Sequence, residues 1–363
     1  MLQLTGPTLL LDKEKCRRNI SVMAQKANRH NLIFRPHFKT HQSLVIGEWF
    51  RQSGVDKITV SSVSMAIYFA NAGWKDITIA FPFNIWEMDK INRLASKITV
   101  NLLIASSETV DYLTHNLNEK VGIFIKIDTG YHRSGLQEND EAEIYKILEL
   151  CLQCKNTDFK GLVTHSGNTY SAQSRDEILT IHDQTVEKIN HLKKNLLRHK
   201  NDIIASIGDT PGCRLSENFE GIDEIRPGNF VFYDLMQLNL GVCSPEEIAV
   251  AMACPVVDKN ISRNQLIIYG GGIHFSKEFL KDSRGTPYYG KIVTLKEDSW
   301  SQPIEGFMLT GLSQEHGIVS GPQQMIEKYG IGDFIGVLPV HSCLTAQCMK
   351  HYVLTTSGMA DHF

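Results

Sequence analysis

The sequence predicts an α/β protein that consists of a (β/α)8 TIM barrel and a C-terminal all-β domain. Eight short runs rich in β-branched residues alternate with amphipathic stretches over about 220 residues, which is typical of a barrel with covering helices. After Leu240 short apolar runs follow one another, parted by Gly, Pro, Asn and Asp. The length of 363 residues also exceeds one ordinary core. We therefore expect a barrel domain at 11–239 and a β-domain at 240–363.

Eight barrel strands are expected, at 32–39, 57–61, 76–81, 98–104, 121–128, 159–165, 203–207 and 222–226. Helices are expected to begin near Asp12, a good N-cap residue, and to cover 107–116, 141–154 and 174–199. An open doubly wound sheet needs a glycine-rich turn after its first strand, and RPHFKTHQ is not one.

The second domain is expected to be built from short strands. These are predicted at 249–253, 266–269, 291–295, 334–339 and 352–356. Residues 1–10 are a candidate added strand of this domain.

Composition excludes several classes of protein. The formal net charge of −3 gives no basic footprint for nucleic acid. No run approaches the roughly 18 apolar residues of a membrane span, and we identify no signal peptide at the start. The eight cysteines are expected to be reduced thiols. We therefore expect a soluble cytoplasmic protein with no nucleic acid or membrane partner.

The end of the first predicted strand is rich in basic side chains. Alternation along a strand places on one face Arg35, His37, Lys39 and His41. A partly desolvated lysine among cations favours its neutral amine, which is how a Schiff-base lysine is activated. The alternative is a solvated basic strand edge.

Polar residues also follow the fifth and sixth strands. Asp128 and Arg133 could orient an anionic or phenolic ligand, although a turn closed by an Asx hydrogen bond explains Asp128 equally well. His165 could stack on a planar ligand or donate a hydrogen bond. A structural histidine is the alternative.

Glycine-containing loops follow the seventh and eighth strands, at 208–212 and 226–229. Barrels commonly hold a phosphate at this pair of loops. Asp209 is discordant, because a carboxylate beside a phosphate is unfavourable unless it points away.

In the second domain, His341 and Cys343 are two residues apart on a predicted strand, so they share a face. Imidazole with thiolate suits Zn²⁺ best, and two protein ligands leave positions for substrate and water. A buried core pair is the alternative. Glu315 and His316 are further candidate ligands.

Together, the motifs RPHFKTH, KIDTGYHRSG, HSGNTY, RPGN and PVHSC resemble fold-type III pyridoxal-phosphate enzymes of the alanine racemase superfamily. The branch that the chain resembles contains D-serine dehydratase and D-threonine aldolase. The resemblance covers nearly the whole chain, and it implies pyridoxal 5'-phosphate and a divalent metal, Zn²⁺ or else Mn²⁺.

The resemblance also implies roles for single residues. Lys39 matches the lysine that holds the cofactor covalently, Arg133 lies near the phenolic oxygen, and His165 is set against the ring. The remaining matches are Tyr170 as a site tyrosine, the phosphate-binding Thr210, Gly228 and Asn229, and the metal pair His341 and Cys343. The family usually has serine where this chain has Asp209.

We expect from this resemblance a lyase that acts on β-hydroxy D-amino acids, by aldol cleavage or by dehydration. The alternatives are an amino-acid racemase, which needs no metal, and a non-catalytic protein that binds pyridoxal phosphate. A homodimer is expected by the same resemblance.

Overall fold

The computed structural model describes residues 4–363 and divides them into two compact units. One unit contains Val22–Lys39 and Phe50–Gly228. The other contains the N-terminal segment through Ser21, together with Thr40–Trp49 and Asn229–Phe363. Residues 1–3 of the predicted added strand lie outside the described residues.

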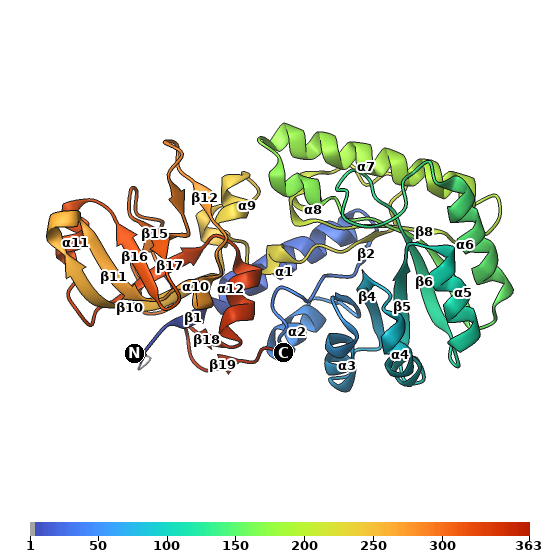
Figure 1. Ribbon diagram of the computed structural model, residues 1–363, viewed down its shortest axis with the longest axis horizontal. Helices are drawn as coiled ribbons and strands as arrows, with labels where there is room; N and C mark the ends of the chain where they lie inside the picture. Colours follow the sequence, from blue (N-terminus) through green and yellow to red (C-terminus); the bar gives the residue numbers. More distant parts are fainter. Residues whose placement is uncertain (1–3) are drawn as a thin grey trace. The chain divides into compact units, whose positions relative to one another are not determined.

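The first unit is an eight-stranded parallel barrel, which confirms the predicted fold (Figure 1). Its sheet runs in the order β2-β9-β8-β7-β6-β5-β4-β3, and an isolated parallel bridge between His37 and Thr59 joins the two ends. The strands are β2 (Ile33–Phe34), β3 (Lys57–Val60), β4 (Asp76–Pro82), β5 (Thr99–Ile104), β6 (Val121–Lys126), β7 (Thr157–Val163), β8 (Ile204–Ile207) and β9 (Glu224–Ile225).

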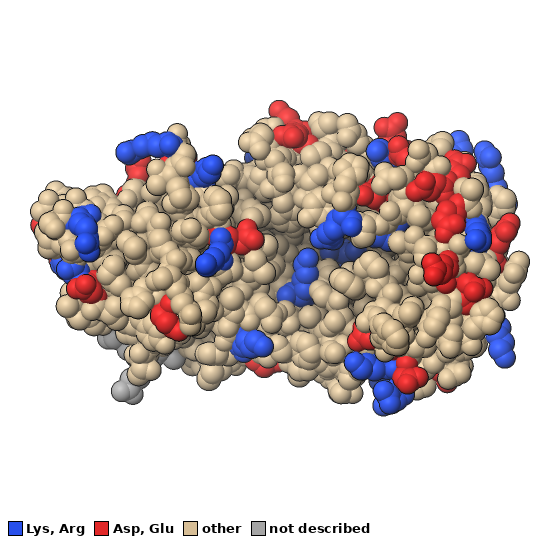
Figure 2. Space-filling model, in the orientation of Figure 1, with Lys and Arg blue, Asp and Glu red and all other residues tan. Residues whose placement is uncertain are grey.

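Helices follow these strands because polar caps start them and apolar faces pack them onto the sheet. Ser62, Ser106 and Ser174 each accept a backbone N–H of the helix that they cap. The helices between the first strand and the last barrel strand are α1 (Lys13–Arg29), α2 (Leu44–Gln52), α3 (Val63–Asn71), α4 (Met88–Ala95), α5 (Ser107–Asn116), α6 (Glu141–Gln153), α7 (Arg175–Leu196) and α8 (Thr210–Leu215). Figure 2 shows acidic side chains gathered over α5 and α6, as expected for a solvated outer face.

Buried ion pairs cross the interior of the barrel. Arg35 Nε lies 2.6 Å from Glu224 Oε2, and Arg35 Nη1 lies 2.6 Å from Asp76 Oδ1. The hydroxyl of Ser206 donates to the other Glu224 oxygen at 2.6 Å. These carboxylates raise the pKa of Arg35 although burial opposes them. Arg35 is thus neutralised inside the barrel.

The second unit is built on an antiparallel sheet, which confirms the predicted all-β domain. The sheet order is β11-β16-β15-β14-β17-β10-β1-β18-β19, and β10 also pairs with β11, so six of these strands form a closed ring. The strands are β1 (Thr8–Leu11), β10 (Val250–Asn260), β11 (Gln265–Tyr269), β14 (Gly290–Val293), β15 (Met308–Leu312), β16 (His316–Ser320), β17 (Phe334–Pro339), β18 (Tyr352–Leu354) and β19 (Met359–Ala360), with β12 (Leu280–Lys281) and β13 (Pro287–Tyr288) as a separate hairpin.

β1 connects the start of the chain to this sheet, antiparallel to β10 and parallel to β18. The helices that follow the last barrel strand are short: α9 (Leu235–Asn239), α10 (Gly272–Phe275), α11 (Gln323–Lys328) and α12 (Ser342–Met349). None of the described helices is long and apolar enough to cross a membrane.

Candidate active site

Lys39 lies in a turn after the first barrel strand. The sequence predicts a continuous strand here, with one face shared by Arg35, His37, Lys39 and His41. This prediction is wrong, because β2 ends at Phe34 and residues 38–41 form a turn. Pro36 has no N–H to donate to a strand ladder, which explains the early end. The turn leaves Lys39 exposed at the C-terminal end of the strand.

His165 follows β7 and is held as a neutral ring. Its Nδ1 lies 2.5 Å from the carbonyl oxygen of Gly208, and because a carbonyl only accepts, Nδ1 carries the proton. Burial and then the charge of Lys39, with smaller effects of Arg133 and Lys126, lower the pKa of His165 well below its ordinary value. The site therefore contains an uncharged imidazole whose Nε2 is an acceptor.

The loop after β6 is organised by Asp128. Its Oδ1 accepts the backbone N–H groups of Gly130, Tyr131 and His132 at 2.9, 2.9 and 3.1 Å. Burial raises the pKa of Asp128, but these hydrogen bonds outweigh it and the pKa is lowered. Asp128 thus closes a turn, as the alternative interpretation holds. The turn places Arg133 over the ring of Tyr131, 4.9 Å from its centroid.

Aromatic rings and a backbone amide complete this end of the barrel. The ring centroid of His165 lies 5.8 Å from that of Tyr131 and 6.3 Å from that of Tyr170. The backbone N–H of Thr210 donates to the hydroxyl of Tyr170 at 3.3 Å. The first unit therefore gathers, after its strand ends, Lys39, Arg133, His165, Tyr170 and Thr210.

Asn229 follows Gly228, and its side-chain amide is hydrogen-bonded to other side chains. Its Nδ2 lies 2.7 Å from Asp234 Oδ2, 3.1 Å from Ser342 Oγ and 3.6 Å from Cys343 Sγ. Its Oδ1 is buried and has no hydrogen-bond partner among residues 4–363. The amide nitrogen of Asn229 is thus engaged by neighbouring side chains, whereas its oxygen is not.

His341 and Cys343 lie together, although not on a strand. β17 ends at Pro339, His341 is the N-cap of α12 and Cys343 is in its first turn, so the prediction of a strand is wrong here. The residues VHSC contain no glycine that would mark a turn, so the change from strand to helix could not be predicted from them. The two side chains are nevertheless close enough for Cys343 to raise the pKa of His341.

Polar groups surround the sulfur of Cys343. Thr40 Oγ1 lies 3.2 Å from Sγ, in addition to the Asn229 amide and His341. Burial lowers the pKa of His341, but Cys343, followed by Asp234 and Glu278, raises it to about 9. The sulfur of Cys343 thus lies among an imidazole, a hydroxyl and an amide.

Glu315 and His316 do not join this pair. His316 begins β16 and pairs in register with Tyr269. The charge of Glu315 opposes the lowering of the His274 pKa by burial. Among residues 4–363 there is no group of three or more His, Cys, Asp or Glu side chains that could hold a metal. A cation on His341 and Cys343 would therefore keep open positions.

One buried residue in each unit was not identified from the sequence. Lys126, at the end of β6, is 7 % exposed, and burial, assisted by Arg226 and Arg133, lowers its pKa to about 7. Asp234 accepts the backbone N–H and hydroxyl of Ser342 at 3.0 and 3.2 Å, which fixes the start of α12. A lysine ending an otherwise apolar strand, VGIFIK, was the one available signal.

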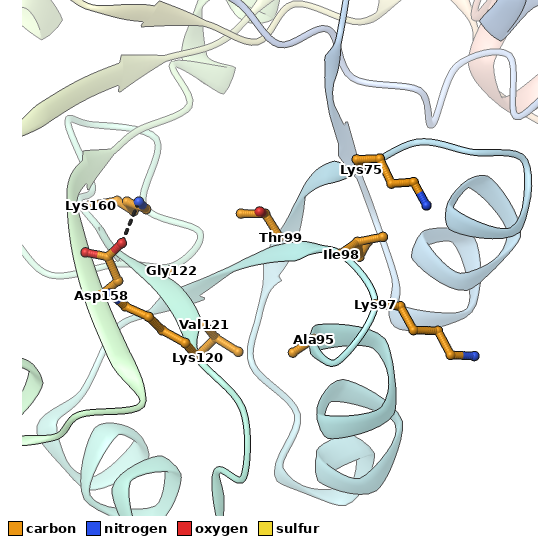
Figure 3. Close-up of a pocket in the computed structure, with 10 residues that line it drawn as sticks. All are labelled: Lys75, Ala95, Lys97, Ile98, Thr99, Lys120, Val121, Gly122, Asp158 and Lys160. Atoms are coloured by element: carbon orange, nitrogen blue, oxygen red, sulfur yellow. Dashed lines mark ion pairs between the residues drawn. The ribbon is translucent and has the colours of Figure 1, made fainter.

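A recess of about 540 Å³ lies at the other end of the barrel, at the N-terminal ends of β5 and β6 (Figure 3). In Figure 3, Lys160 is paired with Asp158 at 2.6 Å, and Lys75 and Lys97 extend away from the opening. Lys39 and His165 follow the C-terminal ends of their strands. This recess is therefore separate from the candidate active site.

Comparison with known proteins agrees with this arrangement. Residues 11–235 match the family described as alanine racemase, N-terminal domain, and residues 249–355 match the putative serine dehydratase domain. D-serine dehydratase of Dictyostelium discoideum is 31% identical, over 96% of this chain and 93% of that protein. D-threo-3-hydroxyaspartate dehydratase of Delftia sp. (strain HT23) is 26% identical, over 99% and 96%.

Solved structures show the same fold. The metal-free form of a mutant D-threo-3-hydroxyaspartate dehydratase has a TM-score of 0.92 at 24% identity, covering 100% of this chain and 98% of that one. The D-threonine aldolase of Filomicrobium marinum has a TM-score of 0.79 at 18% identity, covering 99% and 97%. The family implies pyridoxal phosphate as cofactor. The chain belongs to the alanine racemase superfamily of fold-type III pyridoxal-phosphate enzymes, in the branch of D-serine dehydratase and D-threonine aldolase.

Proposed function

We propose that the chain is a pyridoxal-phosphate- and metal-dependent lyase that acts on β-hydroxy D-amino acids, with dehydration as its main outcome. The observation that carries the metal requirement is the sulfur of Cys343, which His341, Thr40 and Asn229 surround. In sequence, four relatives named as dehydratases match at least 96% of the chain, whereas the three named as aldolases match 64% or less. This difference favours dehydration over aldol cleavage.

The residues of the barrel fit pyridoxal phosphate. Lys39 is an exposed amine on a turn, and His165 offers a flat ring whose N–H is occupied by Gly208, so the ring adds no charge beside the cofactor. Arg133 would lie near the phenolic oxygen, and the phosphate would be held by Thr210, Gly228 and the backbone of Asn229. When bound, the cofactor stabilises negative charge at the substrate Cα.

The pair in the second unit fits a divalent cation, with Zn²⁺ preferred and Mn²⁺ as the alternative. Imidazole and thiolate are zinc ligands, and the orphaned Oδ1 of Asn229 is an acceptor available to a ligated water. As a Lewis acid, the cation would assist departure of the β-hydroxyl.

Lys39 and Tyr170 are proposed as the catalytic side chains together with His165. The amine of Lys39 takes the Cα proton of the substrate. Tyr170, whose oxygen accepts the Thr210 N–H, would help to orient the substrate. His165 would lie against the cofactor ring. Loss of the Cα proton and of the β-hydroxyl together release water.

The decisive experiment incubates purified protein with D-serine, D-threonine and D-alanine, each with and without EDTA, and follows the products by NMR. Pyruvate from D-serine, lost with EDTA, supports the dehydratase. Glycine and acetaldehyde from D-threonine would instead establish an aldolase. L-alanine formed despite EDTA would establish a racemase, and bound cofactor without any turnover would establish a non-catalytic binding protein.

We further propose a cytoplasmic homodimer. All eight cysteines are free, which suits a reducing compartment. On the barrel, Phe81 and Trp86 are 62 % and 89 % exposed, and aromatic side chains of this kind are enriched at protein interfaces. Light scattering after size-exclusion chromatography tests the dimer, and a mass of one chain contradicts it.

A further inference from the structure

The four residues that follow Lys39 in the chain are polar, yet they are buried. Thr40, His41, Gln42 and Ser43 are each at most 6 % exposed, whereas the side chain of Lys39 is exposed. Burying a polar group costs free energy unless the group is hydrogen-bonded. The partners of these residues therefore show what holds this stretch of the chain in place.

Gln42 has a backbone conformation that residues with a side chain rarely adopt. Its φ is +48°, in the left-handed region. Its Nε2 donates to Oε1 of Gln347 at 2.6 Å, and its carbonyl oxygen accepts the N–H of Phe363 at 2.8 Å. A strained conformation of this kind persists only where its surroundings determine it, and such residues cluster at functional sites. The strain at Gln42 therefore points to a role for the contacts that maintain it.

Asp361 closes the N-terminus of α2 from outside the helix. Its Oδ2 accepts the N–H of Leu44 at 2.9 Å, and its Oδ1 accepts the N–H of Val45 at 3.1 Å and the hydroxyl of Ser43 at 2.8 Å. The hydroxyl oxygen of Ser43 in turn accepts the N–H of Ile46 at 3.2 Å. The first three N–H groups of α2, which have no partner within the helix, are thus satisfied.

Two further contacts join the same stretch to the second half of the β-domain. The hydroxyl of Tyr352 donates to the carbonyl oxygen of His41 at 2.7 Å, and Thr40 Oγ1 lies 3.2 Å from Sγ of Cys343. All of these contacts lie within the second unit, and Figure 1 shows the C-terminal residues beside α2. Each residue at 40–45 is therefore bonded to a residue at 343–363.

We propose that Asp361 is a positioning residue for the reaction. By fixing the backbone at 43–45, it holds the turn at 38–41 in the conformation that presents the amine of Lys39 to the substrate Cα. Asp361 acts through the backbone and needs no contact with the substrate. A reacting group that is displaced by about 1 Å can lower the rate about 100-fold, so this restraint matters for catalysis. The inference rests on the proposed function for Lys39.

The first test is hydrogen–deuterium exchange of the cofactor-free protein, in the wild type, in Asp361→Ala and in a matched control, Asp333→Ala. Asp333 accepts the N–H of Gly330 at 2.7 Å in an exposed turn of the same unit. The N–H groups of Leu44 and Val45 should exchange faster in Asp361→Ala, because they lose their acceptors, and should be unchanged in the control. Unchanged exchange in Asp361→Ala would overturn the proposal.

The second test measures the kinetics of the holoenzyme with D-serine. In Asp361→Ala, kcat counted per bound cofactor should fall at least about tenfold while KM changes less than about threefold, because proton transfer by Lys39 is felt in the transition state. A general loss of folded protein would not lower kcat per bound cofactor. The control should keep both constants. A wild-type kcat in Asp361→Ala would overturn the proposal.

Asp361→Asn provides a graded comparison. It keeps one acceptor oxygen and replaces the other with an NH2 donor, so its exchange rates and its kcat should lie between those of the wild type and those of Asp361→Ala. It also takes the place of Asp361→Ala should that variant unfold, as judged by circular dichroism. A wild-type kcat together with faster exchange would show that the segment does not position Lys39.

A measurement without cofactor separates this inference from the proposed function. The rate at which a small acylating reagent modifies Lys39, followed by peptide mass spectrometry with Lys160 as internal reference, should differ about twofold or more between Asp361→Ala and the wild type, because the surroundings of an amine set its neutral fraction. Failure of every protein to act on any D-amino acid would refute the proposed function. The modification rate would still decide the placement of Lys39, since equal rates contradict it.

Discussion

Arg35 Nε and Glu224 Oε2 lie 2.6 Å apart, and both side chains are buried inside the barrel. Glu224→Gln removes the charge at nearly constant volume and leaves Arg35 with the partly exposed Asp76 alone. Because breaking a buried pair strands a charge, we expect a loss of about 3–5 kcal/mol in the free energy of unfolding, measured with urea. Asp158→Asn at the partly exposed Lys160 pair is the control and should cost less than about 1 kcal/mol. Equal losses would show that the buried pair contributes no more to the free energy of unfolding than the control pair does.

Lys39 should be the lysine that carries the cofactor. Borohydride reduction of the holoenzyme followed by peptide mass spectrometry should place the pyridoxyl group on Lys39, since its amine is exposed on a turn at the strand end. Lys39→Ala should lose the adduct and at least about 1000-fold in kcat, because no other group replaces both of its roles. Lys160→Ala, at the opposite end of the barrel, should keep both. An adduct on Lys126 would refute the assignment.

Cys343 should determine the metal content. Cys343→Ser should lower the bound metal per chain to near zero, measured by atomic emission, because one of only two protein ligands is weakened. Cys348→Ser, an exposed cysteine in the same helix, is the matched control and should keep its metal. Unchanged metal in the Cys343 variant would move the site elsewhere.

Metal affinity should rise with pH. The pKa of His341 is about 9, so below that pH the cation must displace a proton from the imidazole. We expect a gain of about tenfold per pH unit for each proton released, measured between pH 6.5 and 8.5 with a chelator as competitor. An affinity independent of pH would show that His341 is not a ligand.

Lys126 should destabilise the fold in a pH-dependent way. Its pKa is lowered from 10.5 to about 7, so between these values the unfolded chain binds the proton that the folded chain has lost. Stability attributable to this residue therefore rises with pH over that range, and the penalty is fully present below pH 7. The stability difference between Lys126→Met and the wild type should shrink by roughly 3–4 kcal/mol from pH 7 to pH 10 in urea unfolding. A constant difference would contradict the lowered pKa.

Helices and strands could be predicted from the sequence where the capping residues and the apolar spacing indicate the same bounds. The helix at 107–116 was predicted with the bounds that it has, because Ser106 caps it and its apolar spacing is regular. The first strand was overestimated because the alternation continued past Pro36, whose missing N–H decided the outcome. His341 and Cys343 were expected on one face of a strand, yet a helix N-terminus joins them.

The rest depended on residues distant in sequence. The lowered pKa of Lys126 depends partly on Arg226, and the position of His316 depends on its pairing with Tyr269. The confinement of the Asn229 side chain depends on Ser342, more than 100 residues later. No local pattern contains such information.

The pairing of β1 with β10 and β18 has a consequence for biosynthesis. The barrel strands are all synthesised by Ile225, so they can pair while the ribosome is still translating. The edges of β1 must wait for Val250–Asn260 and then for Tyr352–Leu354, which are both synthesised after the barrel. Such long-range pairing is slow, because the entropic cost of closing the loop comes before the strands gain their contacts. β1 therefore finds its partners later than the barrel strands find theirs, and during that interval it exposes an apolar TLLL segment that chaperones can bind.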